Sequence, residues 1–151
     1  TSVSRGLGDV YKRQPLLLAG GGATQIALAR HLRRFAERFA GREQLAIEAF
    51  ADALEIIPRT LAQNAGLDPL DSLLQTVAKQ TTTGGSVGHR IGLNVDKKAP
   101  SDMVDDGVVE PLRITRQVLA GATEAALSVL RIDDVLWAKQ DPTEPDLPDE
   151  D

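Results

Sequence analysis

The stretch that decides how this chain folds reads Gly20-Gly21-Gly22-Ala23-Thr24. It lies between an apolar run, residues 15–19, and a long helical pattern that opens at Gln25. Three consecutive glycines cost more backbone entropy on folding than any other triplet, so we expect them where a strand turns sharply into a helix. The start of a helix also carries unpaired N–H groups and a partial positive charge, which suit a nucleotide. A flexible link before the helix is the alternative, and the glycines alone do not decide between the two.

Composition narrows the classes of protein to which the chain can belong. Its 151 residues include 22 Asp and Glu against 17 Lys and Arg, and this acidic balance argues against a nucleic-acid partner. Cysteine is absent, which excludes disulfides, thiolate zinc sites and cysteine nucleophiles. His31 and His89 lack metal-ligand spacing, so we predict ordinary residues and no metal site. No apolar run approaches the roughly 20 residues that span a bilayer, so we expect a cytoplasmic protein without a membrane partner.

The two ends of the chain differ from its middle. Residues 1–14 show little hydrophobic period and resemble read-through from a cloning or sequencing adapter, so we expect a disordered stub. Residues 141–151 are rich in proline and acidic side chains with almost nothing to bury, which predicts a disordered tail. Residues 15–140 are therefore the part that we expect to fold.

Helical periodicity dominates the first half of this folding part. A first helix is predicted from Gln25 to near Gly41, a glycine that would end it. A second helix covers residues 45–64, and Pro58 is expected to interrupt it. Asp68 is a predicted N-cap for a third helix, because proline follows it at the first helical position. Aromatic residues make up only 3% of the chain, so the core must be aliphatic, which favours packed helices.

The second half of the folding part mixes short strands with one more helix. Residues 81–88 are polar and contain glycine, which predicts a loop. A β-hairpin is predicted near 90–103, and residues 107–111 are expected to lead into the longest helix of the chain. A closing strand is predicted near 131–137. The fold class predicted from these pieces is mainly α, with short β-strands.

Taken in order, the pieces resemble the C-terminal part of a group II chaperonin subunit, of the thermosome/TRiC-CCT family. The resemblance spans roughly residues 15–140. Its motifs are archaeal-like and differ from those of the bacterial chaperonins. Six motifs carry it: GGGAT at 20–24, REQLAIEAFADAL at 42–54, IPRTLAQNAGLDP at 57–69, GLNV at 92–95, GVVEPL at 107–112 and LRIDDV at 130–135. Each motif alone is weak, whereas six in this order are specific to the family.

The resemblance implies a fold and a role. Residues 15–140 would be the C-terminal half of the equatorial, ATP-binding domain of a subunit. Such subunits assemble into two stacked rings, in which ATP binding and hydrolysis close a lid over a non-native protein. The implied partners are other chaperonin subunits and unfolded client proteins, the latter bound through an apical domain that this sequence lacks.

The matching motifs also imply which residues contact the nucleoside of ATP. They are Gly20, Gly21, Gly22, Asn94, Val95 and Glu110. The glycine backbone would allow close approach to ribose and adenine, Asn94 and Val95 would lie beside the adenine, and Glu110 would accept hydrogen bonds from the ribose hydroxyls. Two other interpretations stay open. Asn94 could close a turn beside its strand, and Glu110 could be a charge favoured at a helix start.

Groups that bind and hydrolyse the phosphates are absent from this sequence. It has no Gly-Asp-Gly-Thr-Thr phosphate loop, no magnesium-binding aspartate near one, and no Walker-type P-loop. The resemblance therefore implies that Mg²⁺ is bound by the N-terminal part of the subunit, and we expect no catalytic residue and no ATPase activity in this chain alone. The alternative function is a small helical interaction module that binds no nucleotide, in which the glycines are a hinge and Glu110 has no role.

Overall fold

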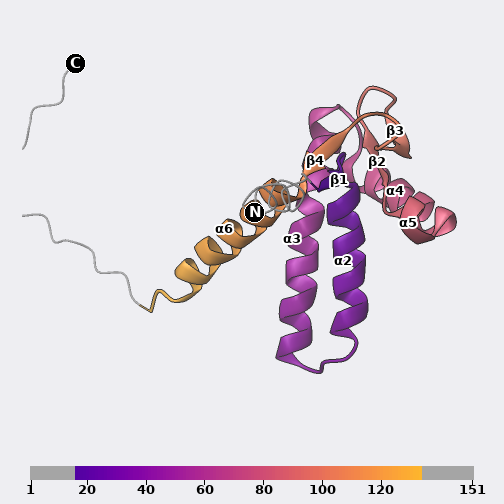
Figure 1. Cartoon of the computed structure of the whole chain (residues 1–151). Coiled ribbons are helices and arrows are strands. Elements are labelled where there is room, and N and C mark those ends of the chain that lie inside the picture. Colours follow the sequence, from indigo (N-terminus) through magenta and orange to yellow (C-terminus); the bar gives the residue numbers. More distant parts are fainter. Residues whose placement is uncertain (1–15, 134–151) are drawn as a thin grey trace, which may run out of the picture. The chain divides into compact units, whose positions relative to one another are not determined.

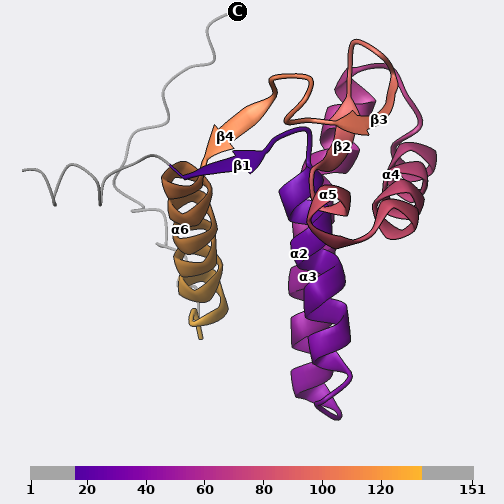
Figure 2. The same cartoon turned by 45° about the vertical axis from the view of Figure 1, so that its right-hand side comes forward.

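A computed structural model describes residues 16–133 (Figures 1 and 2). The predicted stub at 1–14 and the predicted tail at 141–151 lie outside these residues. The described helices are α2 (Ala23–Ala36), α3 (Arg42–Asn64), α4 (Pro69–Thr83), α5 (Gly85–Gly88) and α6 (Leu112–Leu130). The described strands are β1 (Leu17–Ala19), β2 (Ile91–Asn94), β3 (Ala99–Asp102) and β4 (Val109–Pro111). The prediction of a mainly α fold with short strands is confirmed.

Helices α2 and α3 pack against each other as a long hairpin, side by side in Figure 1 and overlapping in Figure 2. Small buried side chains, including Ala29 of α2 and Ala51 of α3, let the two helices approach closely. Arg33 of α2 adds an ionic link, because it pairs with Asp52 at 2.7 Å and with the buried carboxylate of Glu55. The hydrogen bond from Arg33 to Glu55 raises the pKa of Arg33, so the guanidinium stays charged in this contact.

Pro58 does not interrupt the second helix, contrary to the sequence prediction. Helix α3 runs unbroken through it, although proline removes one backbone donor. The proline is buried against the glycine turn, where a Cβ added to Gly22 would lie only 2.6 Å from the Cβ of Pro58. We infer that this packing, with the flanking turns of a 23-residue helix, offsets the lost hydrogen bond.

Helix α4 begins as predicted and ends later than predicted. The Asp68 side chain accepts a hydrogen bond from the backbone N–H of Asp71 at 2.7 Å, which confirms the N-cap. The helix continues to Thr83, and α5 follows, so most of the loop predicted at 81–88 is helical. The hydroxyls of Thr81 and Thr82 bond to backbone carbonyls one turn earlier, so these polar side chains are satisfied within the helix.

Two antiparallel strand pairs complete the fold. Strands β2 and β3 form the hairpin predicted near 90–103. Strand β4 pairs with β1, a pairing that the sequence did not predict, and it leads directly into α6, as predicted for residues 107–111. The longest described helix is α3, with 23 residues, whereas α6 has 19. The prediction that the helix after residue 111 is the longest was therefore wrong. Of the strand predicted near 131–137, residues 131–133 form no strand, and the rest lies outside the described residues.

The described residues divide into two compact units, with the boundary inside α6 after Arg116. The first unit contains every residue of the candidate site. A cluster of buried side chains, Ala19, Ala23 and Met103, lies directly beneath the turn between β1 and α2. None of the described helices is both long enough and apolar enough to cross a membrane.

Candidate functional site

The glycine triplet forms the turn that joins β1 to α2. Gly21 has a φ of 59° and Gly22 a φ of 74°, both in the left-handed region that side chains disfavour. A Cβ on Gly21 would lie 2.7 Å from the carbonyl oxygen of Leu93 in β2. The backbone geometry and the close approach of β2 together require glycine here, so the sharp strand-to-helix turn predicted from the sequence is what the structure contains.

Hydrogen bonds fix this turn to two other segments. Gly20 donates to the carbonyl of Val108 at 3.0 Å, and the Gly21 carbonyl accepts from the N–H of Leu93 at 2.8 Å. Within residues 16–133, the N–H groups of Gly21 and Gly22 make no hydrogen bond. Gly22 is buried against Pro58, whereas Gly21 is half-buried, so the N–H of Gly21 is the donor that another group can reach.

Glu110 lies beside the glycine turn, in the middle of β4. It is the register partner of Leu18, and its neighbour Val109 pairs with Ala19, the residue before the glycines. The side chain is half-buried, and the Thr115 hydroxyl donates to its Oε2 at 3.4 Å. A hydrogen bond this long leaves most of the accepting capacity of the carboxylate unused. The alternative interpretation was that Glu110 is a charge at the start of a helix. Glu110 does precede α6, but it belongs to strand β4.

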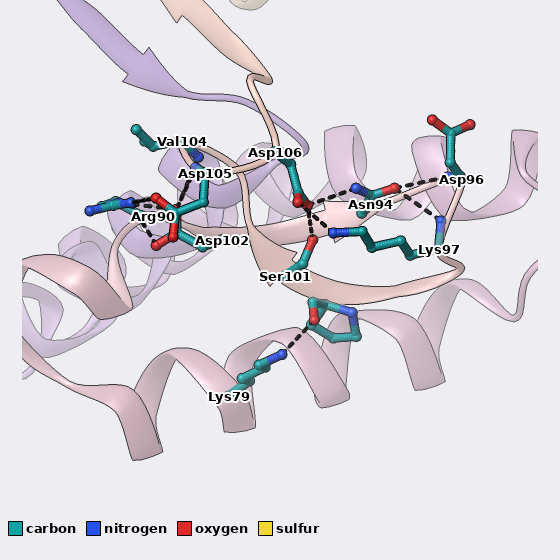
Figure 3. A network of polar contacts seen from close by, with 11 residues as sticks. Lys79, Arg90, Asn94, Asp96, Lys97, Ser101, Asp102, Val104, Asp105 and Asp106 are labelled. Carbon is teal, nitrogen blue, oxygen red and sulfur yellow. Dashed lines mark hydrogen bonds and ion pairs between the residues drawn. The ribbon is translucent and has the colours of Figure 1, made fainter.

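Asn94 ends β2 and closes the turn into β3. Its Oδ1 accepts from the backbone N–H groups of Asp96 and Lys97, at 3.0 Å each, and its Nδ2 donates to Asp106 at 2.7 Å (Figure 3). These contacts favour the turn-closing interpretation for the side chain, which keeps one N–H free of these bonds. Val95 follows it, with 38% of its surface exposed.

Asp106, which the sequence prediction did not include, connects the end of β2 with the turn and the strand that follow it. Asp106 accepts hydrogen bonds from Lys97, Ser101 and Asn94, and these bonds, that of Lys97 foremost, hold its pKa well below the ordinary value of 3.8. A separate pair of contacts joins Arg90 to Asp102 and to Asp105 (Figure 3).

Two buried residues of the site also escaped the sequence prediction. Gly92 lies so close to the glycine turn that a Cβ would be 2.7 Å from the carbonyl oxygen of Gly20. Met103 is fully buried between the two segments. A glycine inside a strand pattern is the signal that could have revealed the close approach, since such glycines often mark contact with another backbone. No comparable signal identifies Met103.

The two histidines share a groove of about 550 Å³ on the first unit. His31 comes from α2 and His89 from the end of α5, and the other lining groups are largely aliphatic, among them Leu17 and Leu28. Proximity of these two residues was not predicted from their distant positions in the sequence. The described residues contain no cluster of His, Cys, Asp or Glu side chains that could hold a metal ion.

Comparisons with known proteins agree on one family. Residues 9–140 match the TCP-1/cpn60 chaperonin family. A thermosome subunit of Methanocaldococcus jannaschii is 55% identical over 124 residues, which cover 82% of this chain and 22% of that protein. Thermosome subunit 1 of Haloferax volcanii is 52% identical over 122 residues, covering 81% of this chain and 21% of that protein.

A solved structure shows the same fold. The open-state monomer of a group II chaperonin from Methanococcoides burtonii superposes with a TM-score of 0.71 at 42% identity, over 77% of this chain and 28% of that one. The chain thus spans about a fifth of the length of the curated relatives that it matches.

Proposed function

This chain belongs to the TCP-1/cpn60 chaperonin family, and from that membership we propose that it supplies the nucleoside side of the ATP pocket in a group II chaperonin subunit. The subunit works with others in a double ring and assists the folding of unfolded client proteins in the cytoplasm. Phosphates and Mg²⁺ are bound by another part of the subunit, so the 151-residue chain alone releases no phosphate from ATP.

One observation carries this proposal: the glycine turn, the end of β2 and Glu110 are bonded into a single cluster. Residues 20, 93 and 110 are far apart in the sequence, yet hydrogen bonds and strand pairing join their segments. A nucleoside needs a surface for its flat base and acceptors for its ribose hydroxyls. This cluster offers the backbone of the glycine turn and, at Glu110, a carboxylate with spare lone pairs.

The residues present fit an adenine nucleoside in three respects. Glu110 can accept from two adjacent ribose hydroxyls, and the unpaired N–H group of Gly21 can donate to an electronegative atom. Val95 presents exposed apolar surface at the end of β2 against which a base can pack. Asn94 contributes by shaping that turn, because its side chain is committed to the chain's own bonds.

Replacing the carboxylate tests the proposal. Glu110→Gln keeps the shape of the side chain and removes its charge, so we expect the affinity for fluorescently labelled ADP to fall about tenfold, the weight of one charge-assisted hydrogen bond. Glu43→Gln, on the exposed first turn of α3, is the matched control and should bind as the unaltered chain does. Equal affinity in both variants, or no binding by the unaltered chain, would overturn the nucleoside site and favour the interaction module.

A further inference from the structure

We propose that Asp106 is a positioning residue for the nucleoside site, holding the turn with Asn94 and Val95 in register with the strand that carries Glu110. This inference rests on the proposed function. It concerns a side chain that need not contact the ligand, because its three hydrogen bonds are all made within the chain.

Side chains from three neighbouring segments converge on Asp106. Asn94 comes from the end of β2, Lys97 from the following turn, and Ser101 from β3 (Figure 3). One carboxylate thus joins both strands of the hairpin and the turn between them. Each bond is charge-assisted, and such bonds are about twice as strong as neutral ones.

The side chain of Asn94 sets the backbone direction at Val95. The Asn94 amide can rotate, but donation to Asp106 at 2.7 Å fixes its Nδ2 end. Its Oδ1 is then aimed at the N–H groups of Asp96 and Lys97, each 3.0 Å away. Val95 lies between Asn94 and these two residues in the chain, so its backbone direction follows from the orientation of that amide.

Backbone hydrogen bonds connect Asp106 with the strand that carries Glu110. The N–H of Asp106 donates to the carbonyl of Asp102 at 3.0 Å, and two residues later Val108 donates to Met103 at 2.8 Å. The Val108 carbonyl then accepts from Gly20 at the glycine turn. Displacing Asp106 therefore disturbs the loop that aligns β4 with β1, as well as the turn that follows β2.

The charge of Asp106 fits this role. An aspartate is ionised at neutral pH, and the hydrogen bonds from Lys97, Ser101 and Asn94 lower the pKa of Asp106 further, because they favour the charged form that accepts all three bonds. The other carboxylates of the segment, Asp102 and Asp105, face Arg90 instead. Asp105→Asn is therefore a matched control: it removes a neighbouring charge from an ion pair without touching the Asn94 contact.

The experiment compares Asp106→Asn and Asp105→Asn in the 151-residue chain. Labelled ADP is titrated well below the unfolding temperature, and backbone amide resonances of the folded state are recorded by NMR without ligand. For Asp106→Asn we expect an affinity about fivefold lower, with shifted amides at both Val95–Lys97 and Val108–Glu110. For Asp105→Asn we expect unchanged affinity and shifts confined to the surroundings of Arg90.

The outcomes separate this inference from the function on which it rests. If the unaltered chain binds ADP and Glu110→Gln weakens it, but Asp106→Asn binds normally, only the positioning role is overturned. Shifts restricted to the immediate neighbours of Asp106 would overturn it as well, because they would show that the two segments are not coupled. A chain that binds no ADP removes the nucleoside site, and the positioning role with it.

Discussion

At the scale of single residues, glycine at position 21 is required by protein packing rather than by a ligand. Its φ is positive, and β2 occupies the space where a side chain would lie. The sequence predicted the sharp turn at residues 20–22, because consecutive glycines before a helical pattern are typical of a backbone that bends where side chains do not fit. The partner across the turn could not be predicted, since no local pattern links Gly21 to a strand as distant in the sequence as β2.

Substituting this glycine tests its role in packing. Gly21→Ala should lower the free energy of unfolding by about 3 kcal/mol, because a positive φ and a buried clash add together. Gly66→Ala, at the end of α3, is the control: its φ is also positive, at 72°, but no atom lies within 4 Å of the added Cβ, so only about 1 kcal/mol should be lost. Urea denaturation of both variants measures the difference, and equal losses would contradict the packing role.

At the scale of elements, local signals predicted helices well and strand partners poorly. The Asp68 cap and the hairpin near 90–103 are set by neighbouring residues, and both are confirmed. The structure at Pro58 and the pairing of β4 with β1 depend on segments far away in the chain: the predicted interruption at Pro58 was wrong, and the pairing was not predicted. Tertiary packing outweighs a proline's local preference when its ring fills a site such as the one beside Gly22.

Gln80 shows how a single side chain can hold three elements together. Its Nε2, on α4, donates to the carbonyl of Ala23 in α2 at 3.0 Å and to that of Ile91 in β2 at 2.8 Å. The residue is 2% exposed, so water cannot replace these bonds. Helical spacing places Gln80 on the face of the buried Leu73, seven residues earlier, whereas Gln75 is an exposed glutamine on the same helix. The two carbonyls that Gln80 reaches could not be predicted from the α4 sequence.

Removing this amide should therefore destabilise the fold around the site. Gln80→Leu removes both buried hydrogen bonds and leaves the Ile91 carbonyl without this donor, and we expect a loss of about 2 kcal/mol in the free energy of unfolding. Gln75→Leu loses only an exposed bond to Asp71 and should change stability by less than about 0.5 kcal/mol. Thermal or urea unfolding measures both, and a Gln80 variant as stable as the Gln75 variant would refute the linking role.

At the scale of the whole molecule, the chain has the fold of a chaperonin equatorial segment while spanning about a fifth of its relatives. Apolar side chains on its first unit, such as Leu45 and Leu74, are more than half exposed. The sequence motifs predicted the family because six of them occur in order, whereas the network around Asp106 became visible only when residues 94, 97, 101 and 106 were brought together.

The most direct test of the central claim is an NMR titration of the 151-residue chain with ADP. If the glycine turn and Glu110 hold one nucleoside, the amides of Gly21, Gly22 and Glu110 should shift together, along a single binding curve. Adenosine should produce the same shifts, because the proposed contacts are to base and ribose. Shifts at the glycines without Glu110, or at neither, would contradict a shared nucleoside site.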